Sequence, residues 1–500
     1  MGASPSVDTG SGATVSRKAD HIRINVEEDV SSKGVPSGFE RYRFLHCALP
    51  EIDLADVEMA TSFFGRSLDV PILISCMTGG VPEAEAINRT LAETAQAFGL
   101  ALGLGSARVL LEHPTALPSF DMRRYAPDVP ILANLGAVQL NKGVTTDDCR
   151  RLIDLLQADA LVLHLNPLQE ALQPEGDTEF GGLLERIEAL VKALDTPVVV
   201  KEIGWGIAPD LVSRLVDAGV VAIDVAGAGG TSWSEVERHR MNSPVRARVA
   251  AAFADWGIPT AEVLVAARQA APQAVIIASG GVRSGMDVAK AVALGADIVG
   301  LAGPFLRAAA HSPEAARELA MELVEVLRTT MFVVGVRNLT ALRGTNRLIL
   351  EGSSVDGQAG IVRRYKTRGR GEFLDITEDV VDFARVCGVR NGIIHVASPH
   401  TTAAIRINEN EPLLLEDFRT LLDRLAPHGN YRHDNLSKRE TVPPEEPQNG
   451  RSHCQHLLLS SSESLAIIDG ALRLGDWQRV FLIELDAPRE RQVTLQAVGR

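Results

Sequence analysis

Eight short apolar runs set the pattern of hydrophobic and polar positions between about residues 71 and 303. Each run is followed by glycine or polar residues, and then by a stretch with apolar residues at helical spacing. Nearly continuous apolar runs of this length are typical of strands that are buried on both faces of a parallel sheet. The runs are Pro71–Ser75, Leu100–Leu104, Pro130–Ala133, Ala160–Leu163, Pro197–Val200, Val221–Val225, Ala274–Ile277 and Asp297–Leu301.

Helices are predicted between these strands, and several end in glycine (Gly99, Gly219 and Gly295), as a left-handed C-cap prefers. Eight strand–helix units in about 230 residues match the size of a (β/α)8 TIM barrel. A doubly wound open sheet is the alternative, although it rarely has eight equal repeats. The predicted helices are Glu83–Phe98, Thr146–Gln157, Phe180–Leu194, Ala208–Ala218 and Met286–Leu294.

The pattern changes beyond a further predicted helix, Ser312–Val334. Residues 344–360 are rich in Gly, Ser, Asn and Asp, which is typical of a linker. After them, shorter β-type runs flank one amphipathic helix, which predicts a smaller α+β domain. Its strands are predicted at Gly392–Ala397, Ala403–Ile407 and Val480–Leu485, and its helix at Leu413–Leu425. We therefore expect a disordered tail over residues 1–16, a barrel over 17–345, a linker over 346–360 and an α+β domain over 361–500.

The composition narrows the possible functions. The net charge of −14 argues against a general nucleic-acid or anionic-membrane binder, because such proteins need a basic face. The five cysteines are odd in number and widely spaced, which predicts a reducing cytoplasmic location rather than a disulfide framework. No apolar run approaches the roughly 18 residues of a membrane span. The small and polar residues 1–16 lack the apolar core of a signal peptide.

Polar and glycine residues follow the eight predicted strands, and in a (β/α)8 barrel these positions form the catalytic rim. The loops after strands seven and eight are the usual phosphate cradle of such barrels. Gly280 and Gly281 permit close approach of the backbone, and Arg283 adds positive charge. The simpler interpretation of any one such loop is a tight turn. At the other end of the segment, Arg17-Lys18-Ala-Asp-His21 is either an ordinary charged stretch or a basic arm that closes over a diphosphate.

Taken in order, these motifs resemble type 2 isopentenyl-diphosphate isomerase, an FMN-dependent family, over about residues 17–345. Each motif is modest alone, but the ordered set is specific. The motifs that carry the resemblance are Arg17–His21, Met77–Gly80, Asn134–Ala137, His164–Glu170, Lys201-Glu202, Gly229–Trp233, Trp256–Thr260 and Ala278–Arg283.

The resemblance implies which residues bind cofactor and substrate. It implies FMN contacts at Met77, Thr78, Gly79, Ser106, Asn134, Lys201, Thr231, Gly281, Val282, Arg283, Ala302 and Gly303. It implies substrate contacts at Arg17, Lys18, Ser106, Arg108 and Gln169. Glu170 resembles the ligand of a Mg²⁺ ion that bridges the diphosphate oxygens, and carboxylate and phosphate oxygens suit that hard cation. The chain departs from the family at Ala107, where Gln is usual, which predicts the loss of one substrate hydrogen bond.

The reaction of that family moves a double bond between isopentenyl and dimethylallyl diphosphate, with no net redox change. The rim offers few titratable side chains, and Gln169, Glu170 and His164 are the catalytic candidates. This scarcity fits a mechanism in which reduced FMN serves as acid and base, so that NADPH is needed only to reduce the flavin. His164 is equally well read as a core histidine.

Two alternatives use the same barrel. An FMN-dependent hydroxy-acid oxidase or dehydrogenase has a similar phosphate segment over residues 280–296, but it needs a catalytic His at the end of strand six. Here Val225–Thr231 contains none. A flavin-binding scaffold without catalysis is the other alternative, and nothing in the sequence favours it.

In the C-terminal part, His400, His433 and His453 are candidates for a His₃ metal site, although separate surface histidines are the commoner outcome of such long spacings. His400–Ala403, Ile407–Asn410 and Gly475–Gln478 resemble the YjbQ-like family, the secondary thiamine-phosphate synthase family. That resemblance implies that the three histidines bind Zn²⁺ or another divalent metal, with His456 or Cys454 as possible replacements. Because the barrel family favours tetramers or octamers and the YjbQ-like family trimers, a homo-oligomer is expected.

Overall fold

The computed structural model describes residues 10–350, 358–439 and 447–499, with side chains from residue 18 onward except those of residues 82, 358 and 359. The chain forms two compact units. One unit combines the chain up to Glu40 with His46–Thr345, and the other combines Arg41–Leu45 with the chain from Asn346 onward. In the described residues, no helix combines the length and apolar character needed to cross a membrane.

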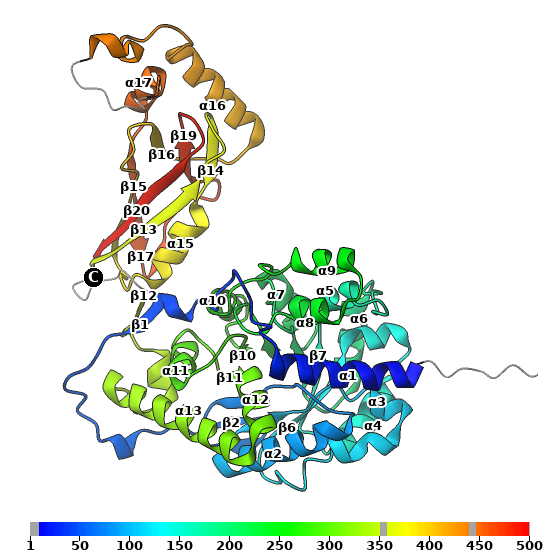
Figure 1. Cartoon of the computed structure of the whole chain (residues 1–500). Coiled ribbons are helices and arrows are strands. Elements are labelled where there is room, and N and C mark those ends of the chain that lie inside the picture. Colours follow the sequence, from blue (N-terminus) through cyan, green and yellow to red (C-terminus); the bar gives the residue numbers. More distant parts are fainter. Residues whose placement is uncertain (1–9, 351–357, 440–446, 500) are drawn as a thin grey trace, which may run out of the picture. The chain divides into compact units, whose positions relative to one another are not determined.

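The first unit is built on a closed barrel of eight parallel strands, in the order β10-β11-β4-β5-β6-β7-β8-β9. Helices such as α2 (Pro82–Phe98), α7 (Pro209–Asp217) and α13 (Pro313–Val334) lie on the outside of this unit (Figure 1). All eight predicted strands are present, so the predicted fold class is confirmed. The strands are β4 (Ile72–Ile74), β5 (Ala101–Gly103), β6 (Ile131–Gly136), β7 (Ala160–His164), β8 (Val198–Lys201), β9 (Ala222–Asp224), β10 (Val275–Ser279) and β11 (Ile298–Leu301).

Helices surround this barrel, and local sequence sets their ends. At α4, Thr145 and Asp148 form a reciprocal capping box that satisfies backbone N–H groups of the first turn. At α2, the chain leaves the helix at Gly99, whose φ of 60° is unfavourable for other residues. The main helices are α2 (Pro82–Phe98), α4 (Thr146–Leu156), α5 (Pro167–Leu172), α6 (Leu183–Ala193), α7 (Pro209–Asp217), α8 (Trp233–Arg240), α9 (Pro244–Ala251), α10 (Thr260–Ala270), α11 (Gly285–Ala293), α12 (Gly303–His311), α13 (Pro313–Val334) and α14 (Leu339–Arg343).

Most predicted boundaries differ from the structure by a few residues, and three differences are informative. The helix predicted from Phe180 begins at Leu183, because Gly182 adopts a left-handed φ of 67° as its N-cap. Helix α1 (Gly10–Glu27) extends into the predicted tail, of which residues 1–9 lie outside the described part. The predicted linker contains strand β12 (Leu348–Leu350), which pairs with β1 (Tyr42–Phe44), while residues 351–357 are not described.

A short hairpin closes one end of the barrel. Strands β2 (Thr61–Phe63) and β3 (Arg66–Leu68) place Phe63 and Leu68 in a buried cluster with residues near the start of the barrel strands, such as Ala101 and Ala160. The apolar core therefore fills the end of the barrel at which the strands begin. The end at which they finish is left for the site.

The second unit contains two antiparallel sheets. The five-stranded sheet has the order β13-β20-β15-β17-β18, and the three-stranded sheet has the order β14-β19-β16. Helix α16 covers the smaller sheet, where Leu415 and Leu422 pack on Phe481 and Ile483. The elements are β13 (Gln358–Lys366), β14 (Glu372–Asp375), α15 (Thr377–Val386), β15 (Gly392–Ala397), β16 (Ala403–Asn408), α16 (Pro412–Leu425), α17 (Gly450–Leu458), β17 (Ser462–Ile468), β18 (Ala471–Leu472), β19 (Arg479–Glu484) and β20 (Glu490–Gly499).

Candidate active site

A cavity of about 650 Å³ lies at the ends of the barrel strands and the loops that follow them. Every residue for which the sequence predicts an FMN contact lies on its wall. So do Lys18, Arg108, Gln169, Glu170 and His164, whereas the side chain of Arg17 lies outside the described residues. The structure thus brings the described candidates together, and their individual roles stay predictions.

One side of the cavity has the geometry of an anion cradle. Gly280 and Gly281 have φ values of 106° and 72°, and a Cβ atom on Gly280 would lie 2.0 Å from the carbonyl oxygen of Gly227. Only glycine fits this close turn. The loop leads into helix α11, and helix α12 begins on the same wall at Gly303. Backbone N–H groups at helix N-termini favour phosphate, and Arg283, anchored by a hydrogen bond to the Gly229 carbonyl, adds charge.

Another part of the wall carries buried hydroxyl groups whose hydrogen-bonding capacity the described residues do not satisfy. Within the described residues, the buried hydroxyls of Ser75 and Thr78 have no hydrogen-bond partner, and both residues line the cavity. Leaving buried polar groups unsatisfied costs free energy, which argues for a bound polar group there. Lys201 stands at the end of β8 and donates a hydrogen bond to the Glu202 carbonyl. These features fit a flavin ring with polar edges.

His164, at the end of β7, is neutral at physiological pH. Burial and the positive charges of Lys201 and Lys18 lower the pKa of its imidazole to about 3. One ring nitrogen, Nδ1, lies 2.8 Å from the amide oxygen of Asn134, so it carries the proton and donates. The other nitrogen is then an acceptor and not a proton source.

Glu170 lies in an oxygen-rich corner of the cavity. Its carboxylate accepts hydrogen bonds from the Asn166 side chain and from the backbone N–H of Asp177, both at 2.8 Å. The Asn166 amide oxygen is buried and has no hydrogen-bond partner among the described residues. A single carboxylate with neutral oxygens suits Mg²⁺ that also binds substrate phosphates. The described residues contain no group of three acidic, His or Cys ligands, so any such ion would need substrate oxygens or water.

Glu237 is a site residue that the sequence interpretation missed. It lies on α8 with an almost completely buried carboxylate, which accepts hydrogen bonds from His21 and Gln169 at 3.0 Å each and from Arg240 at 2.6 Å. Burial raises its pKa, but the His21 and Gln169 hydrogen bonds and Arg240 outweigh this and lower the pKa overall. The signal in the sequence was its place one helical turn after Trp233.

Lys18 and His21, which belong to the predicted basic arm, line the cavity. The Lys18 ammonium donates to the Ser106 carbonyl at 3.0 Å and stands 5.5 Å from the centre of the Phe120 ring. His21 packs edge-on against Trp233, with ring centres 5.1 Å apart. Ala107, by contrast, is fully buried and does not line the cavity. Its neighbours Ser106 and Arg108 do line the cavity, so the predicted loss of one substrate hydrogen bond at this position stays a prediction.

The three candidate metal ligands of the second unit are not assembled. His433 and His453 lie together, with ring centres 4.8 Å apart. His400 instead accepts a hydrogen bond from the backbone N–H of Gln492 at 2.9 Å through its Nε2 atom. In the part of the chain that the structure describes, no group of three or more His, Cys, Asp or Glu side chains is placed to hold a metal.

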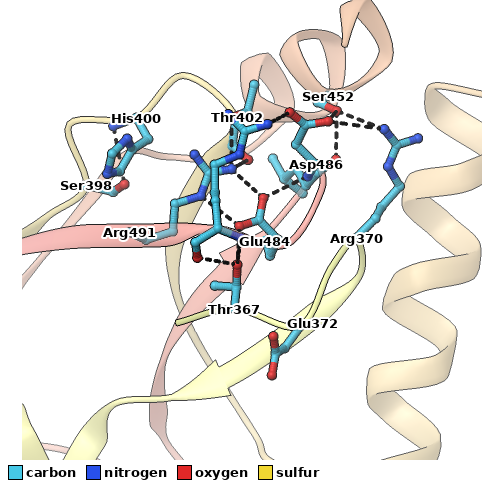
Figure 2. Close-up of polar contacts among 12 residues, drawn as sticks. Thr367, Arg370, Glu372, Ser398, His400, Thr402, Ser452, Glu484, Asp486 and Arg491 are labelled. Atoms are coloured by element: carbon cyan, nitrogen blue, oxygen red, sulfur yellow. Dashed lines mark hydrogen bonds and ion pairs between the residues drawn. The ribbon is translucent and has the colours of Figure 1, made fainter. Parts of the chain in front are cut away.

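A buried ion pair anchors the loop that carries His400 at its Thr402 end (Figure 2). Arg491 and Glu484 pair with side chains 2% and 0% exposed, and Arg491 also donates to the Thr402 carbonyl and hydroxyl. Thr367 donates to the same Glu484 carboxylate at 2.7 Å. The network fixes the loop from Ser398 to Thr402, and it is a structural brace for this loop.

Both units are similar to known protein families. Residues 166–349 match the family model of FMN-dependent dehydrogenase, and residues 362–500 match that of UPF0047 protein YjbQ-like. The closed barrel, its phosphate cradle and the first of these matches define a flavin-binding (β/α)8 barrel. The second unit is similar in sequence to a solved YbjQ-like protein of unknown function from Sulfolobus solfataricus P2, at 29% identity over 29% of this chain and 99% of that one, with a TM-score of 0.25.

Within the flavin-binding class, similar proteins share one name. An isopentenyl-diphosphate delta-isomerase from Nostoc sp. is 51% identical over 344 residues, which are 69% of this chain and 98% of that protein. One from Synechococcus sp. is 53% identical over 327 residues, 65% of this chain and 94% of that protein. The chain belongs to the isopentenyl-diphosphate delta-isomerase family, and it carries a YjbQ-like domain in addition.

Proposed function

We propose that the barrel interconverts isopentenyl and dimethylallyl diphosphate, using reduced FMN, Mg²⁺ held at Glu170, and NADPH as the source of electrons for the flavin. The observation that carries this proposal is the cavity wall. The predicted flavin residues and the described diphosphate residues, contributed by loops far apart in the sequence, face one space.

When bound and reduced, FMN supplies the acid and base for the double-bond shift, because the wall offers so few titratable groups of its own. Gly281, Val282, Arg283 and Gly303 would hold the phosphate of the cofactor. Its ring would be bound by Met77, Thr78, Gly79, Asn134 and Lys201, and the remaining contacts would come from Ser106, Thr231 and Ala302.

The protein binds and orients the substrate. Arg17, Lys18, Ser106 and Arg108 would bind the diphosphate, and Lys18, Ser106 and Arg108 line the cavity. Glu170 and the Asn166 amide oxygen would hold the Mg²⁺. Gln169, whose amide donates to Glu237, would contact the substrate. His164 is proposed to act in its neutral form, because the pKa of its imidazole is lowered to about 3, and its Nδ1–H donates to Asn134.

Proton NMR of isopentenyl diphosphate with the purified protein, FMN, Mg²⁺ and NADPH under anaerobic conditions tests the proposal. We expect dimethylallyl diphosphate only when the flavin is reduced. A hydroxy-acid oxidase is the second candidate, favoured by the family-model match over residues 166–349. The loop after β9 has no histidine to act as its base. Oxidation of a hydroxy acid, with no diphosphate product, would overturn the isomerase assignment.

The role of the second unit is proposed more narrowly. His400, His433 and His453 are proposed to bind Zn²⁺ or another divalent metal, but the described residues do not fit this set, because no group of three such side chains is placed to hold an ion. We derive no reaction from it. Elemental analysis of the purified chain tests for stoichiometric metal.

We also propose that the protein is a cytoplasmic homo-oligomer. All five cysteines are free, which suits a reducing compartment. Light scattering coupled to size exclusion measures the oligomer, and a monomeric mass would contradict it.

A further inference from the structure

Asp177 lies on the loop between α5 and α6 and contacts three residues of the cavity wall without lining the cavity itself. Its carboxylate accepts hydrogen bonds from Arg108 at 3.1 Å and from Gln139 at 3.0 Å. Its backbone N–H donates to Glu170 at 2.8 Å. The three partners come from the loops after three consecutive barrel strands, β5, β6 and β7.

The loop around Asp177 is shaped for these contacts. A Cβ atom on Gly176 would lie 1.8 Å from the carbonyl oxygen of Glu170, so only glycine allows this close approach. Lys142 adds a second cation, 3.3 Å from the other Asp177 oxygen. Burial raises the pKa of Asp177, but hydrogen bonds from Gln139 and Lys142 and the charge of Arg108 lower it overall, so the group is a carboxylate at neutral pH.

The negative charge of Asp177 also favours a role in orienting Arg108 for ligand binding. Arg108 is partly exposed on the wall, and a free arginine loses side-chain freedom when it binds a phosphate. A fixed carboxylate behind it reduces that cost, because the guanidinium is already oriented and retains further N–H groups for the ligand.

We propose that Asp177 is a positioning residue for the diphosphate: its carboxylate holds Arg108 and Gln139 at the cavity wall, while its backbone orients Glu170. The inference rests on the proposed function, in which Arg108 binds the diphosphate and Glu170 binds Mg²⁺. In this proposal, Asp177 contacts both the residue that binds the diphosphate, Arg108, and the residue that binds Mg²⁺, Glu170.

Asp177→Asn is the test, because it keeps the size and one acceptor but removes the charge. We expect the KM for isopentenyl diphosphate to rise about tenfold, which corresponds to the loss of one charge-assisted contact. The Mg²⁺ concentration for half-maximal rate should stay within about twofold, because the variant keeps the backbone N–H that donates to Glu170, and kcat at saturation should also change by less than about twofold. Flavin absorbance and the melting temperature report whether the variant is folded.

Glu179→Gln is the matched control. Glu179 is exposed and also pairs with Lys142, but it makes no side-chain contact with Arg108, Gln139 or Glu170 in the described structure. Both KM and the Mg²⁺ requirement should stay within about twofold of the original values. An equal rise in this variant would mean that the charge of the loop matters and not its position, and would overturn the proposal.

Arg108→Gln then separates the inference from the function on which it rests. This change should raise KM, and adding Asp177→Asn to it should raise KM no further. If Arg108→Gln raises KM but Asp177→Asn does not, or if the two effects simply add, Asp177 has no positioning role and the substrate site still stands. If Arg108→Gln leaves KM unchanged, both the substrate assignment of Arg108 and the inference fail.

Discussion

At the residue scale, the site combines a few charged groups with neutral ones whose state is set by burial. Glu170 is the group on which the metal proposal depends, since its carboxylate faces the cavity between Asn166 and the Asp177 backbone. His164 is the opposite case, because burial and nearby cations keep it uncharged. These two residues lead to separate predictions.

Glu170→Gln should lower isomerase turnover by about 100-fold. Changing a residue that only supports a metal ligand commonly costs about 10- to 100-fold in activity, and here the proposed ligand itself loses its charge. The FMN colour should remain, since no predicted flavin contact is altered. The measurement is NMR turnover together with the visible absorbance of the purified variant. Unchanged turnover would refute the Mg²⁺ assignment.

His164→Gln should flatten the dependence of barrel stability on pH. The folded pKa of about 3 lies below the unfolded value of roughly 6.5, so the unfolded chain binds a proton that the folded one does not. Stability present above about pH 6.5 is therefore lost as pH falls towards 3. Relative to neutral pH, this histidine lowers the free energy of unfolding of the original chain by about 2 kcal/mol at about pH 5, and the variant lacks this contribution. Thermal unfolding of the flavin-free proteins at about pH 5 and 7.5 measures it, and parallel curves would contradict it.

At the scale of the element, the barrel strands could be predicted because each is a continuous apolar run, and these runs recur between stretches with apolar residues at helical spacing. The hairpin of β2 and β3 was not predicted, since its short strands mix polar and apolar residues and belong to no such repeat. Strand β12 was hidden in a segment whose composition is typical of a linker, because its partner β1 lies far away in the sequence. Short pairings of this kind depend on tertiary contacts that local sequence does not encode.

The same limit applies to the site. The glycines after β10 and the His164–Glu170 motif stand next to their strands, so their place on the rim follows from the barrel. Glu237 and Asp177 act through partners that are distant in the sequence, and only the folded chain brings them together. The ion pair that fixes the His400 loop was likewise invisible in the spacing of the histidines.

Helix α4 offers a test of the local rules. Thr145→Ala removes the hydroxyl that accepts the Asp148 N–H and breaks the capping box. We expect a loss of about 1 kcal/mol in the stability of this region. Hydrogen exchange of the first-turn amides of α4 should accelerate about fivefold, with turnover unchanged because α4 is remote from the cavity wall. Unaltered exchange would mean that the cap does not stabilise the helix.

At the scale of the whole molecule, two compact units are encoded in one chain, each with its own core. We therefore expect their functions to be separable. His453→Ala should lower any metal content of the purified protein to below stoichiometric, because His453 lies beside His433. It should leave turnover at the barrel within about twofold of the original. Elemental analysis and the NMR assay measure both, and retained metal would exclude His453 as a ligand.

The pairing of β1 with β12 has a consequence for how the protein is made. Synthesis on the ribosome runs from the N-terminus, so Tyr42–Phe44 emerges early and its partner only after the entire barrel has been translated. Until then this strand edge is unsatisfied on the nascent chain. A gene that ended after the barrel would leave β1 without its partner β12 in the finished protein. Dividing the coding sequence at one point therefore does not yield two units that each keep all of their strand pairs.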